Sequence, residues 1–328
     1  MGKLPGRARV LIALAIISTG PAGAEDAGQI DKIVFAPIES RTDGHVQVVG
    51  GEPVDAKYWR TLLIAQTGWA VDPDGKPLYD DKGERVPETC TASLVGPGVA
   101  LTAAHCIDKQ DGAAERNASL QVRDKDKTVL TLDMRCRLPS TYVADQWKGR
   151  SPRNSHDFAL CTFAVPPNAP LFKGMRYEVI EAGNAPNGGQ DVLLTGYGCK
   201  GLKMGANGVE GETFDQIFTI ANAAIDDPSY RGNVEIYSNG TTRPVLCFGD
   251  SGGPLMIGVS TDTQGLTVPR RILAVNSSIE RRDAYYASQM SPLTQVAFRT
   301  FLAEWRLKNP GAILCGDPAT SVKPPCRN

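Results

Sequence analysis

The sequence predicts an all-β protein with one C-terminal helix. Short apolar segments separated by turns recur along most of the 328 residues, and 34 glycines and 23 prolines punctuate them. Many short strands with such punctuation are typical of β-barrels and sandwiches. Near the C-terminus the pattern changes, and apolar residues recur at helical spacing.

The chain begins with a pattern typical of a secretory signal peptide. Basic residues precede a short apolar run, Val10–Ile17, and a stretch of small residues follows before Glu25. A short buried helix is the weaker alternative. No later segment reaches the roughly 20 apolar residues of a membrane helix. We therefore expect residues 1–24 to be a signal peptide, and a secreted or periplasmic protein without a membrane span.

Ten segments are expected to be strands, because they are rich in apolar or β-branched residues and are bounded by turn residues. They are 61–66, 93–95, 99–102, 119–122, 129–132, 158–163, 192–195, 216–221, 255–259 and 271–276. The proline-rich stretch 165–171 is the best candidate for a linker between two halves.

The helix is expected over residues 292–308. Ser291 and Pro292 offer an N-cap and a first-turn proline, and apolar residues follow at helical spacing as far as Trp305. Pro310 then ends the pattern. One amphipathic helix should therefore pack on the β-sheet body.

Composition excludes several classes of partner. The net charge is −1, from 35 basic and 36 acidic residues, so neither a basic stripe for nucleic acid nor a polybasic membrane patch is expected. Eight cysteines in an exported chain, without closely spaced metal-binding pairs, predict four disulfides and no metal or other cofactor. Counting cysteines leaves their connectivity open.

The stretch FGDSGGP surrounds Ser251 with three glycines, which allow unusual backbone dihedrals and close approach. A serine nucleophile needs an adjacent base, and the base needs an orienting group. Of the three histidines, His45 and His156 lie in polar, loop-like segments and are expected to be exposed. His105 follows an apolar strand in LTAAHC. Taken alone, it would be a core histidine.

A carboxylate completes the set. Asp157 begins DFALCTF and would, taken alone, be a turn residue. Together, LTAAHC, HDFAL and GDSGGP, in the order His, Asp, Ser, resemble the trypsin and chymotrypsin-like family of serine proteases. VVGGEPVDAKYW, residues 48–59, resembles the mature N-terminus of that family, and LTGYGC, residues 194–199, resembles its glycine-aromatic-glycine turn. The resemblance extends over nearly the whole mature chain, although only the motif segments match closely.

The resemblance implies a chymotrypsin-like fold of two antiparallel six-stranded β-barrels, followed by the C-terminal helix. The implied parts are a pro-segment at 25–47, an N-terminal barrel at 48–165, a C-terminal barrel at 166–290, and a helix and tail at 291–328. His105 and Asp157 would come from the first barrel and Ser251 from the second, so that the site lies between them.

The resemblance also implies a mechanism. Ser251 attacks a peptide carbonyl, His105 takes its proton, and Asp157 holds the imidazole tautomer. Backbone N–H groups of Gly249 and Ser251 form the oxyanion hole. The partner is then a protein or peptide substrate, and we expect a monomer. The alternative is a catalytically silent, protease-like binding module, which the presence of all three residues disfavours.

Asp250 requires its own explanation. A carboxylate buried beneath the serine needs a cation, because an unpaired buried charge is strongly destabilising. In the family this cation is the α-amino group of the cleaved chain, here Val48, which implies a zymogen. Gln47 stands where the family usually has Arg or Lys, so the activating cut is left open. The bland alternative is that residues 50–53 form an ordinary turn.

Substrate preference follows from the same resemblance. The base of the specificity pocket would be Val245, six residues before the serine, so selectivity for Arg or Lys is disfavoured. Asn276-Ser277-Ser278 would be the edge that pairs with substrate as an added strand. Ser278 would narrow the pocket mouth, which favours a neutral or small apolar side chain.

The resemblance implies bridges Cys90–Cys106 and Cys199–Cys247 beside the site. Cys136–Cys161 would tie neighbouring strands of the first barrel, and Cys315–Cys326 would close the tail. Each disulfide should contribute about 2 to 4 kcal/mol.

Overall fold

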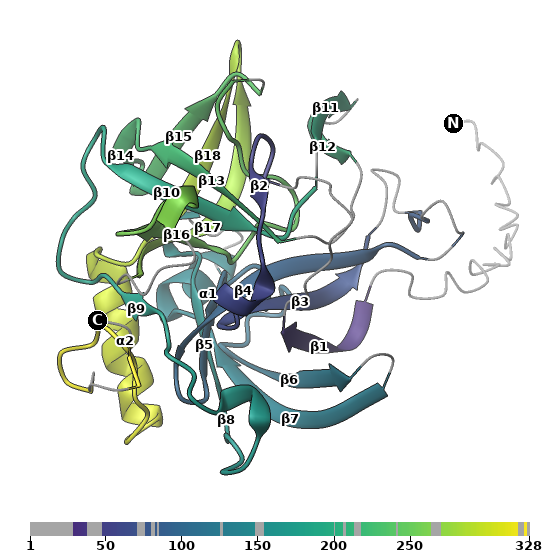
Figure 1. Cartoon of the computed structure of the whole chain (residues 1–328). Helices are drawn as coiled ribbons and strands as arrows, with labels where there is room; N and C mark the ends of the chain where they lie inside the picture. The colour runs from purple at the N-terminus through teal and green to yellow at the C-terminus, as the bar shows by residue number, and fades with distance from the viewer. Residues whose placement is uncertain are drawn as a thin grey trace, which may run out of the picture.

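A computed structural model of the chain is shown in Figure 1. It describes residues 29–37, 48–70, 76–79, 83, 85–124, 127–147, 154–199, 201–205, 208–212, 218–240, 242–263, 270–320 and 325–326. The predicted signal peptide and Gln47 lie outside the described residues.

Seven strands form a closed barrel in the lower half of Figure 1. They are β1 (Gln29–Pro37), β3 (Leu62–Trp69), β4 (Pro87–Gly96), β5 (Val99–Thr102), β6 (Glu115–Asp124), β7 (Lys127–Arg137) and β8 (Ala159–Phe163). The order around the barrel is β1, β3, β4, β5, β8, β7, β6, and β6 pairs back with β1. The six strands expected in this half of the chain are all present.

Strand β1 is the seventh, and it lies in the segment expected to be a pro-segment. It runs antiparallel to β3, with Phe35 opposite Ala65, and parallel to β6, with Phe35 opposite Leu120. Ile33 and Phe35 belong to the buried core. This barrel therefore has seven strands rather than six, because β1 is inserted between β3 and β6.

Nine strands form the second sheet, a half-barrel in the upper half of Figure 1. They are β2 (Glu52–Pro53), β9 (Val179–Ile180), β10 (Asp191–Gly196), β13 (Thr219–Ala224), β14 (Asp227–Tyr230), β15 (Asn233–Ser238), β16 (Pro254–Ile257), β17 (Arg271–Arg282) and β18 (Tyr285–Pro292). The order is β14, β15, β18, β17, β16, β10, β13, β2, with β9 beside β17. A separate hairpin joins β11 (Gly201–Gly205) and β12 (Gly208–Glu212).

The predicted fold class is confirmed: two barrel-like sheets are followed by a C-terminal helix. The number of strands differs from six in each unit. In the second unit the additional strands include β14, β15 and β18, none of which was expected from the sequence.

Helices are few. The α-helices are α1 (Ser140–Trp147) and α2 (Val296–Lys308), and the 3₁₀ turns are Ala56–Tyr58, Asn154–His156, Pro170–Phe172 and Thr261–Thr263. No helix in the described part of the chain is both long and apolar enough to cross a membrane.

The start of α2 corrects the prediction. The helix begins at Val296 rather than Pro292. Ser291 and Pro292 end β18 instead, where they lie opposite Val275 and Ala274 of β17. Pairing between β17 and β18 therefore continues through Ser291 and Pro292, the two residues that suggested a helix N-terminus.

Helix α2 packs on the first barrel although it follows the second sheet in the chain. The ring of Phe158, directly before β8, lies 5.1 Å from the ring of Phe298 and 5.6 Å from that of Phe301, between centroids. The hydroxyl of Ser140 donates to Glu304 at 3.0 Å. The last helix therefore supports the segment that leads into β8.

A buried ion pair beside the second sheet contacts residues that precede β3 of the first barrel. Arg270, directly before β17, and Glu178, directly before β9, are 1% and 0% exposed. The Arg270 Nε donates to Glu178 Oε2 at 3.1 Å, and a second guanidinium nitrogen contacts Oε1. The hydroxyl of Thr61, just before β3, donates to the same carboxylate at 2.5 Å, and the guanidinium lies 4.2 Å from the ring centre of Trp59.

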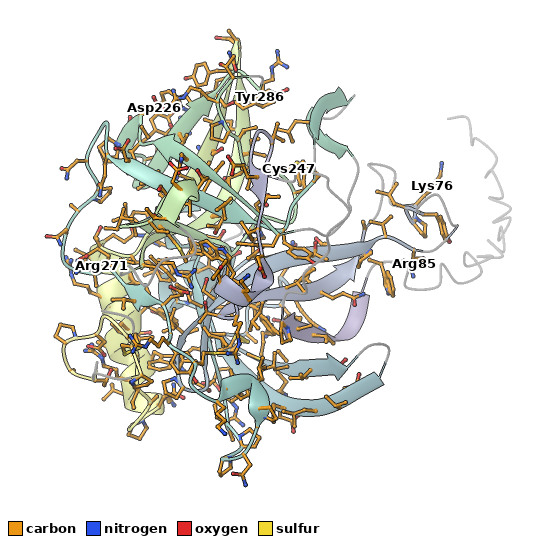
Figure 2. All side chains as sticks on the ribbon, viewed as in Figure 1. Lys76, Arg85, Asp226, Cys247, Arg271 and Tyr286 are labelled. Carbon is orange, nitrogen blue, oxygen red and sulfur yellow. A yellow bond between two sulfur atoms is a disulfide. The ribbon has the colours of Figure 1, made fainter. Side chains whose placement is uncertain are left out.

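The structure forms all four predicted disulfides. They are Cys90–Cys106, Cys136–Cys161, Cys199–Cys247 and Cys315–Cys326. Cys247, labelled in Figure 2, belongs to the loop that carries the predicted nucleophile, and its bridge ties that loop to the end of β10. Two of the four bridges thus hold segments of the candidate site.

Candidate active site

His105 and Asp157 are brought together by two neighbouring strands. Strands β5 and β8 are antiparallel, with Thr102 opposite Ala159. His105 follows the end of β5, and Asp157 precedes the start of β8, so both lie at the same end of this strand pair. The Nδ1 atom of His105 lies 2.6 Å from Oδ2 of Asp157, and the His105 backbone N–H donates to Oδ1 at 2.8 Å.

The two side chains differ in exposure, and the difference matters chemically. The Asp157 side chain is 4% exposed and the His105 side chain is 39% exposed. In the neutral ring, a hydrogen bond from Nδ1–H to the carboxylate leaves Nε2 as a proton acceptor. The pair therefore has the arrangement that a general base requires.

Two opposing effects act on the pKa of His105. Burial lowers this pKa, but the charge of Asp157 and its hydrogen bond outweigh burial, and the pKa is raised above its ordinary value. The charges of Glu88 and Asp108 add smaller raising effects. The imidazolium is thus favoured, and the ring becomes a free base only above the raised pKa.

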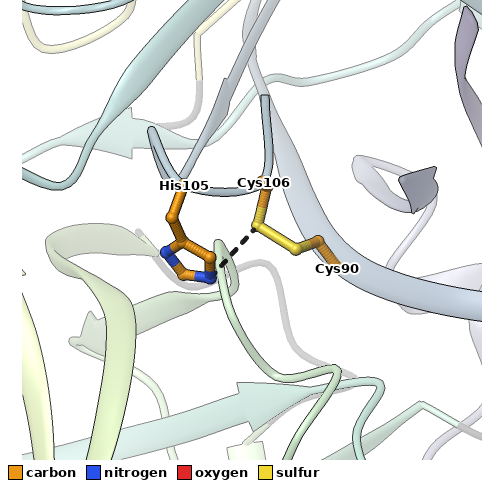
Figure 3. Close-up of side chains that lie close together, drawn as sticks. All are labelled: Cys90, His105 and Cys106. Atoms are coloured by element: carbon orange, nitrogen blue, oxygen red, sulfur yellow. Dashed lines mark hydrogen bonds between the residues drawn. A yellow bond between two sulfur atoms is a disulfide. The ribbon is translucent and has the colours of Figure 1, made fainter. Parts of the chain in front are cut away.

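A disulfide holds the loop that carries His105. The Nε2 atom lies 3.7 Å from Sγ of Cys106, which is bonded to Cys90 (Figure 3). These three residues also bring their donor atoms close enough to suggest a metal site. Both sulfurs are already bonded to each other, however, so they offer no thiolate ligand. The cluster therefore positions the imidazole loop.

Ser277 provides a further hydrogen bond that the sequence analysis did not predict. Its hydroxyl donates to Oδ2 of Asp157 at 2.6 Å, across 120 positions of sequence. The strand register shifts between Asn276 and Ser278, and Ser277 lies at this irregularity in β17. Serine in a strand is common, and no local pattern marks its partner. Only the order of the strands reveals the contact.

We expect Ser277→Ala to lower kcat/KM about 10- to 100-fold, because a hydrogen bond to a charged group contributes about 1.5 to 3 kcal/mol. Asp157 would keep both bonds from His105, so the loss should be far smaller than the loss of the carboxylate itself. Steady-state kinetics on a peptide substrate checks this. The matched control is Ser277→Thr, which retains a hydroxyl and should recover most of the activity. Equal rates in Ser277→Ala and the unsubstituted protein would contradict the assignment.

The loop of Ser251 lies against the strands that carry His105. The backbone N–H of Thr91 in β4 donates to the carbonyl of Ser251 at 2.7 Å. Gly252 has φ +81°, and a Cβ at this position would lie 2.2 Å from both the Thr102 hydroxyl and the Thr91 carbonyl. Glycine is therefore required at 252, both by backbone conformation and by space.

The hydroxyl of Ser251 is not joined to the imidazole. Among the described residues, no hydrogen bond connects its Oγ with Nε2 of His105. Such bonds are often long or poorly aligned until substrate is bound. The structure therefore brings His105 and Asp157 into contact and places the Ser251 backbone beside them.

Two backbone N–H groups in this loop are available. Those of Asp250, Gly252 and Gly253 donate to carbonyl groups at 2.8 to 3.0 Å. Within the described part of the chain, the N–H groups of Gly249 and Ser251 donate to no acceptor. Gly249 has φ +102°, a conformation that favours glycine. The two available donors are those predicted for an oxyanion hole.

Asp250 is fully buried behind this loop. Its carboxylate accepts the backbone N–H groups of Gly198 and Cys247, each at 2.7 Å. A Cβ on Gly198 would lie 2.6 Å from Oδ1, and one on Gly196 would lie 2.0 Å from it. The glycines of the LTGYGC stretch thus make room for this side chain. Burial raises the pKa of Asp250 well above its ordinary value, although the two N–H groups act to lower it.

The predicted partner of Asp250 has a different contact in the uncleaved chain. Val48 is 0% exposed, and its backbone N–H donates to the hydroxyl of Thr219. Val49 pairs with Val245. Among the described residues, no cation forms an ion pair with Asp250. An ion pair with the Val48 α-amino group requires cleavage and stays a prediction.

The residues predicted for the specificity pocket lie on different segments. Val245 is fully buried, and its backbone N–H donates to the Val49 carbonyl at 3.3 Å. Ser278 lies in β17, and its hydroxyl donates to Oε1 of Gln289 in β18 at 2.9 Å. The predicted base of the pocket, Val245, is thus apolar, and the hydroxyl of Ser278 at the predicted pocket mouth is bound to the neighbouring strand β18.

Comparisons with known proteins give one family match and one similar solved structure. The family model described as Trypsin matches residues 78–281. Among solved structures, the chain is similar to a Glu endopeptidase in complex with MPD, with 15% sequence identity and a TM-score of 0.44. That similarity covers 79% of this chain and 99% of the other.

Proposed function

Because the chain belongs to the trypsin family, we propose that it is an exported serine endopeptidase that cleaves protein or peptide substrates. Ser251 is the nucleophile, His105 is the general base, and Asp157 orients the imidazole. The observation that carries this proposal is the contact between His105 Nδ1 and the buried Asp157 carboxylate. This contact directs Nε2 away from the carboxylate. A general base for the serine needs its accepting nitrogen in that orientation.

The reaction proceeds in two halves. Ser251 Oγ forms a bond to the substrate carbonyl carbon while its proton passes to His105 Nε2, and the carbonyl oxygen becomes an oxyanion. The available N–H groups of Gly249 and Ser251 bind this oxygen. His105 then gives the proton to the leaving amine, the C–N bond breaks, and water releases the acyl group by the same steps.

The protein is made as a zymogen in this proposal. Cleavage before Val48 creates an α-amino cation, which then pairs with Asp250. Two observations support the pairing: Asp250 is buried without a cationic partner among the described residues, and Val48 is fully buried, with its backbone N–H bound to Thr219 of β13. A buried charge gains most from such a partner.

The pocket is proposed to accept neutral or small apolar side chains rather than Arg or Lys, because Val245 offers no charge for a basic side chain. Export to an oxidising compartment, outside the cytoplasm or in the periplasm, is supported by the four disulfides and the apolar N-terminal pattern. We propose a monomer.

A fluorophosphonate probe tests the nucleophile directly. The exported chain after cleavage before Val48 should be labelled on Ser251, and Ser251→Ala should lose both the label and about 10⁶-fold in kcat. Ser260→Ala, which removes a serine hydroxyl outside the site, is the matched control and should be labelled normally. Absence of Ser251-dependent labelling in folded, cleaved protein would contradict the proposal. N-terminal sequencing of active protein tests the cut, because a start at Glu25 would contradict the zymogen.

The second candidate is a protease-like binding module without turnover. It is favoured by one observation, the absence of a hydrogen bond between Ser251 and His105 among the described residues. This candidate predicts a folded protein that binds peptides and stays unlabelled in the experiment above.

A further inference from the structure

We propose that the segment cut from the zymogen does not leave the enzyme but stays bound as strand β1 of the first barrel. This inference rests on the proposed cleavage before Val48. The partner it assigns to the enzyme is therefore a second chain, derived from residues 25–47 of the same polypeptide. The mature protein would be a complex of two chains without a covalent link.

Strand β1 is paired on both edges. Residues Val34–Pro37 lie opposite Leu63–Gln66 of β3, and Ile33–Phe35 lie beside Ala118–Leu120 of β6. Without β1, the facing edges of β3 and β6 would lose these backbone partners. Unpaired strand edges are costly when buried and promote aggregation when exposed. Departure of the segment would thus open the barrel that carries His105 and Asp157.

The side chains of β1 also complete the barrel core. Ile33 is 2% exposed and Phe35 is 0% exposed. The alternate residues of the strand, Val34 and Ala36, are partly exposed. The alternation is that of an inner barrel strand with one buried face. Removing an aromatic ring from a packed core leaves a cavity that its surroundings fill only in part.

The described segments on the two sides of the cut are held by separate contacts. Strand β1 ends at Pro37 on the first barrel. Val48 is bound to Thr219 of β13 in the second sheet, and Val49 pairs with Val245. The cut therefore breaks a connection between two segments that are each held by their own contacts. The new amino terminus forms without any need for β1 to separate.

The experiment uses the full exported chain with Ser251→Ala, so that it cannot cleave itself. Residues 43–47 are replaced by the enteropeptidase sequence Asp-Asp-Asp-Asp-Lys, and the protein is cut and passed through gel filtration. Native mass spectrometry should then show the mass of the uncut chain plus one water, and denaturing mass spectrometry should show two fragments. A folded large fragment that has lost the small one would overturn the proposal.

Two β1 variants distinguish strand docking from nonspecific adhesion. Phe35→Ala should weaken retention of the cut fragment about a hundredfold or more. Val34→Thr, an isosteric change on the partly exposed face, is the matched control and should be retained like the unsubstituted fragment. Equal retention of both variants would contradict the docking of β1.

Hydrogen exchange of the cut protein without these substitutions provides a measurement that does not depend on how a variant folds. The amides of residues 33–36 should stay protected after cleavage, and rapid exchange there would contradict the proposal. Both measurements are independent of catalysis. The same cut is made in the chain that keeps Ser251. Loss of the fragment from that protein while fluorophosphonate still labels it would refute β1 retention alone, and retention of the fragment without labelling would refute the enzyme alone.

Discussion

Asp157→Asn is expected to lower kcat about 10⁴-fold while the protein stays folded. The carboxylate accepts both the Nδ1–H and the backbone N–H of His105. An amide in its place can still accept the backbone N–H, but its NH₂ group would face Nδ1 and favour the proton on Nε2. An imidazole in that tautomer cannot take the proton of Ser251.

The same substitution should change the pH dependence of the enzyme. The charge and hydrogen bond of Asp157 raise the pKa of His105 against the lowering effect of burial. Activity needs the neutral ring, so kcat/KM should fall as the pH drops through a pKa above the ordinary value of about 6.5. In Asp157→Asn, burial is no longer opposed by Asp157, and the imidazole pKa should move down. NMR titration of His105 in the Ser251→Ala background measures this shift without turnover.

Glu88→Gln is the matched control for this prediction. It is also a change from acid to amide, but at an exposed residue. The charge of Glu88 raises the His105 pKa, whereas its side chain makes no hydrogen bond to the imidazole. We expect a small downward shift of that pKa and a kcat within about threefold of the unsubstituted enzyme. A loss of less than tenfold in Asp157→Asn, or an equal loss in Glu88→Gln, would contradict the role given to Asp157.

Arg270→Ala is expected to lower the free energy of unfolding by about 3 to 5 kcal/mol, because it leaves the carboxylate of Glu178 buried without its cation. The loss should also affect the contact of the two units, since Glu178 binds Thr61 of the first barrel as well. Urea unfolding, followed by circular dichroism with the disulfides intact, measures the effect.

The neighbouring residue offers a matched control. Arg271 also pairs with a glutamate, Glu181, at 3.0 Å, but its side chain is 48% exposed. Arg271→Ala should therefore cost less than about 1 kcal/mol. A double variant, Arg270→Met with Glu178→Leu, removes both charges and should be more stable than Arg270→Ala. Equal destabilisation by Arg270→Ala and Arg271→Ala would show that burial does not decide the effect.

The features that the sequence predicted well depend on short local patterns. The motifs around His105, Asp157 and Ser251 mark residues beside the ends of two paired strands and in an adjacent loop, because each motif combines a chemical group with the small residues that its surroundings require. Gly252 is an example, since its neighbours leave no room for a Cβ. Strands with apolar, alternating residues were located for the same local reason.

The features that the sequence did not reveal depend on partners far along the chain. Strand β15 contains the buried Glu235, and a charged residue argues against a core strand until its partner is known. That partner is Arg282 of β17, which binds both carboxylate oxygens at 2.9 and 2.6 Å. Likewise, β1 is a strand because β3 and β6 flank it, and Ser277 contacts Asp157 only because β17 passes beside it.

The position of α2 affects the order in which parts of this chain can fold. Phe158 rests against two rings that follow it by about 140 residues. Contacts between such distant positions slow folding, and a nascent polypeptide emerges from its N-terminus. One side of the first barrel therefore lacks its packing partner and is exposed to solvent until α2 has been synthesised. The segment that carries Asp157 therefore gains its final packing only after α2 has been synthesised.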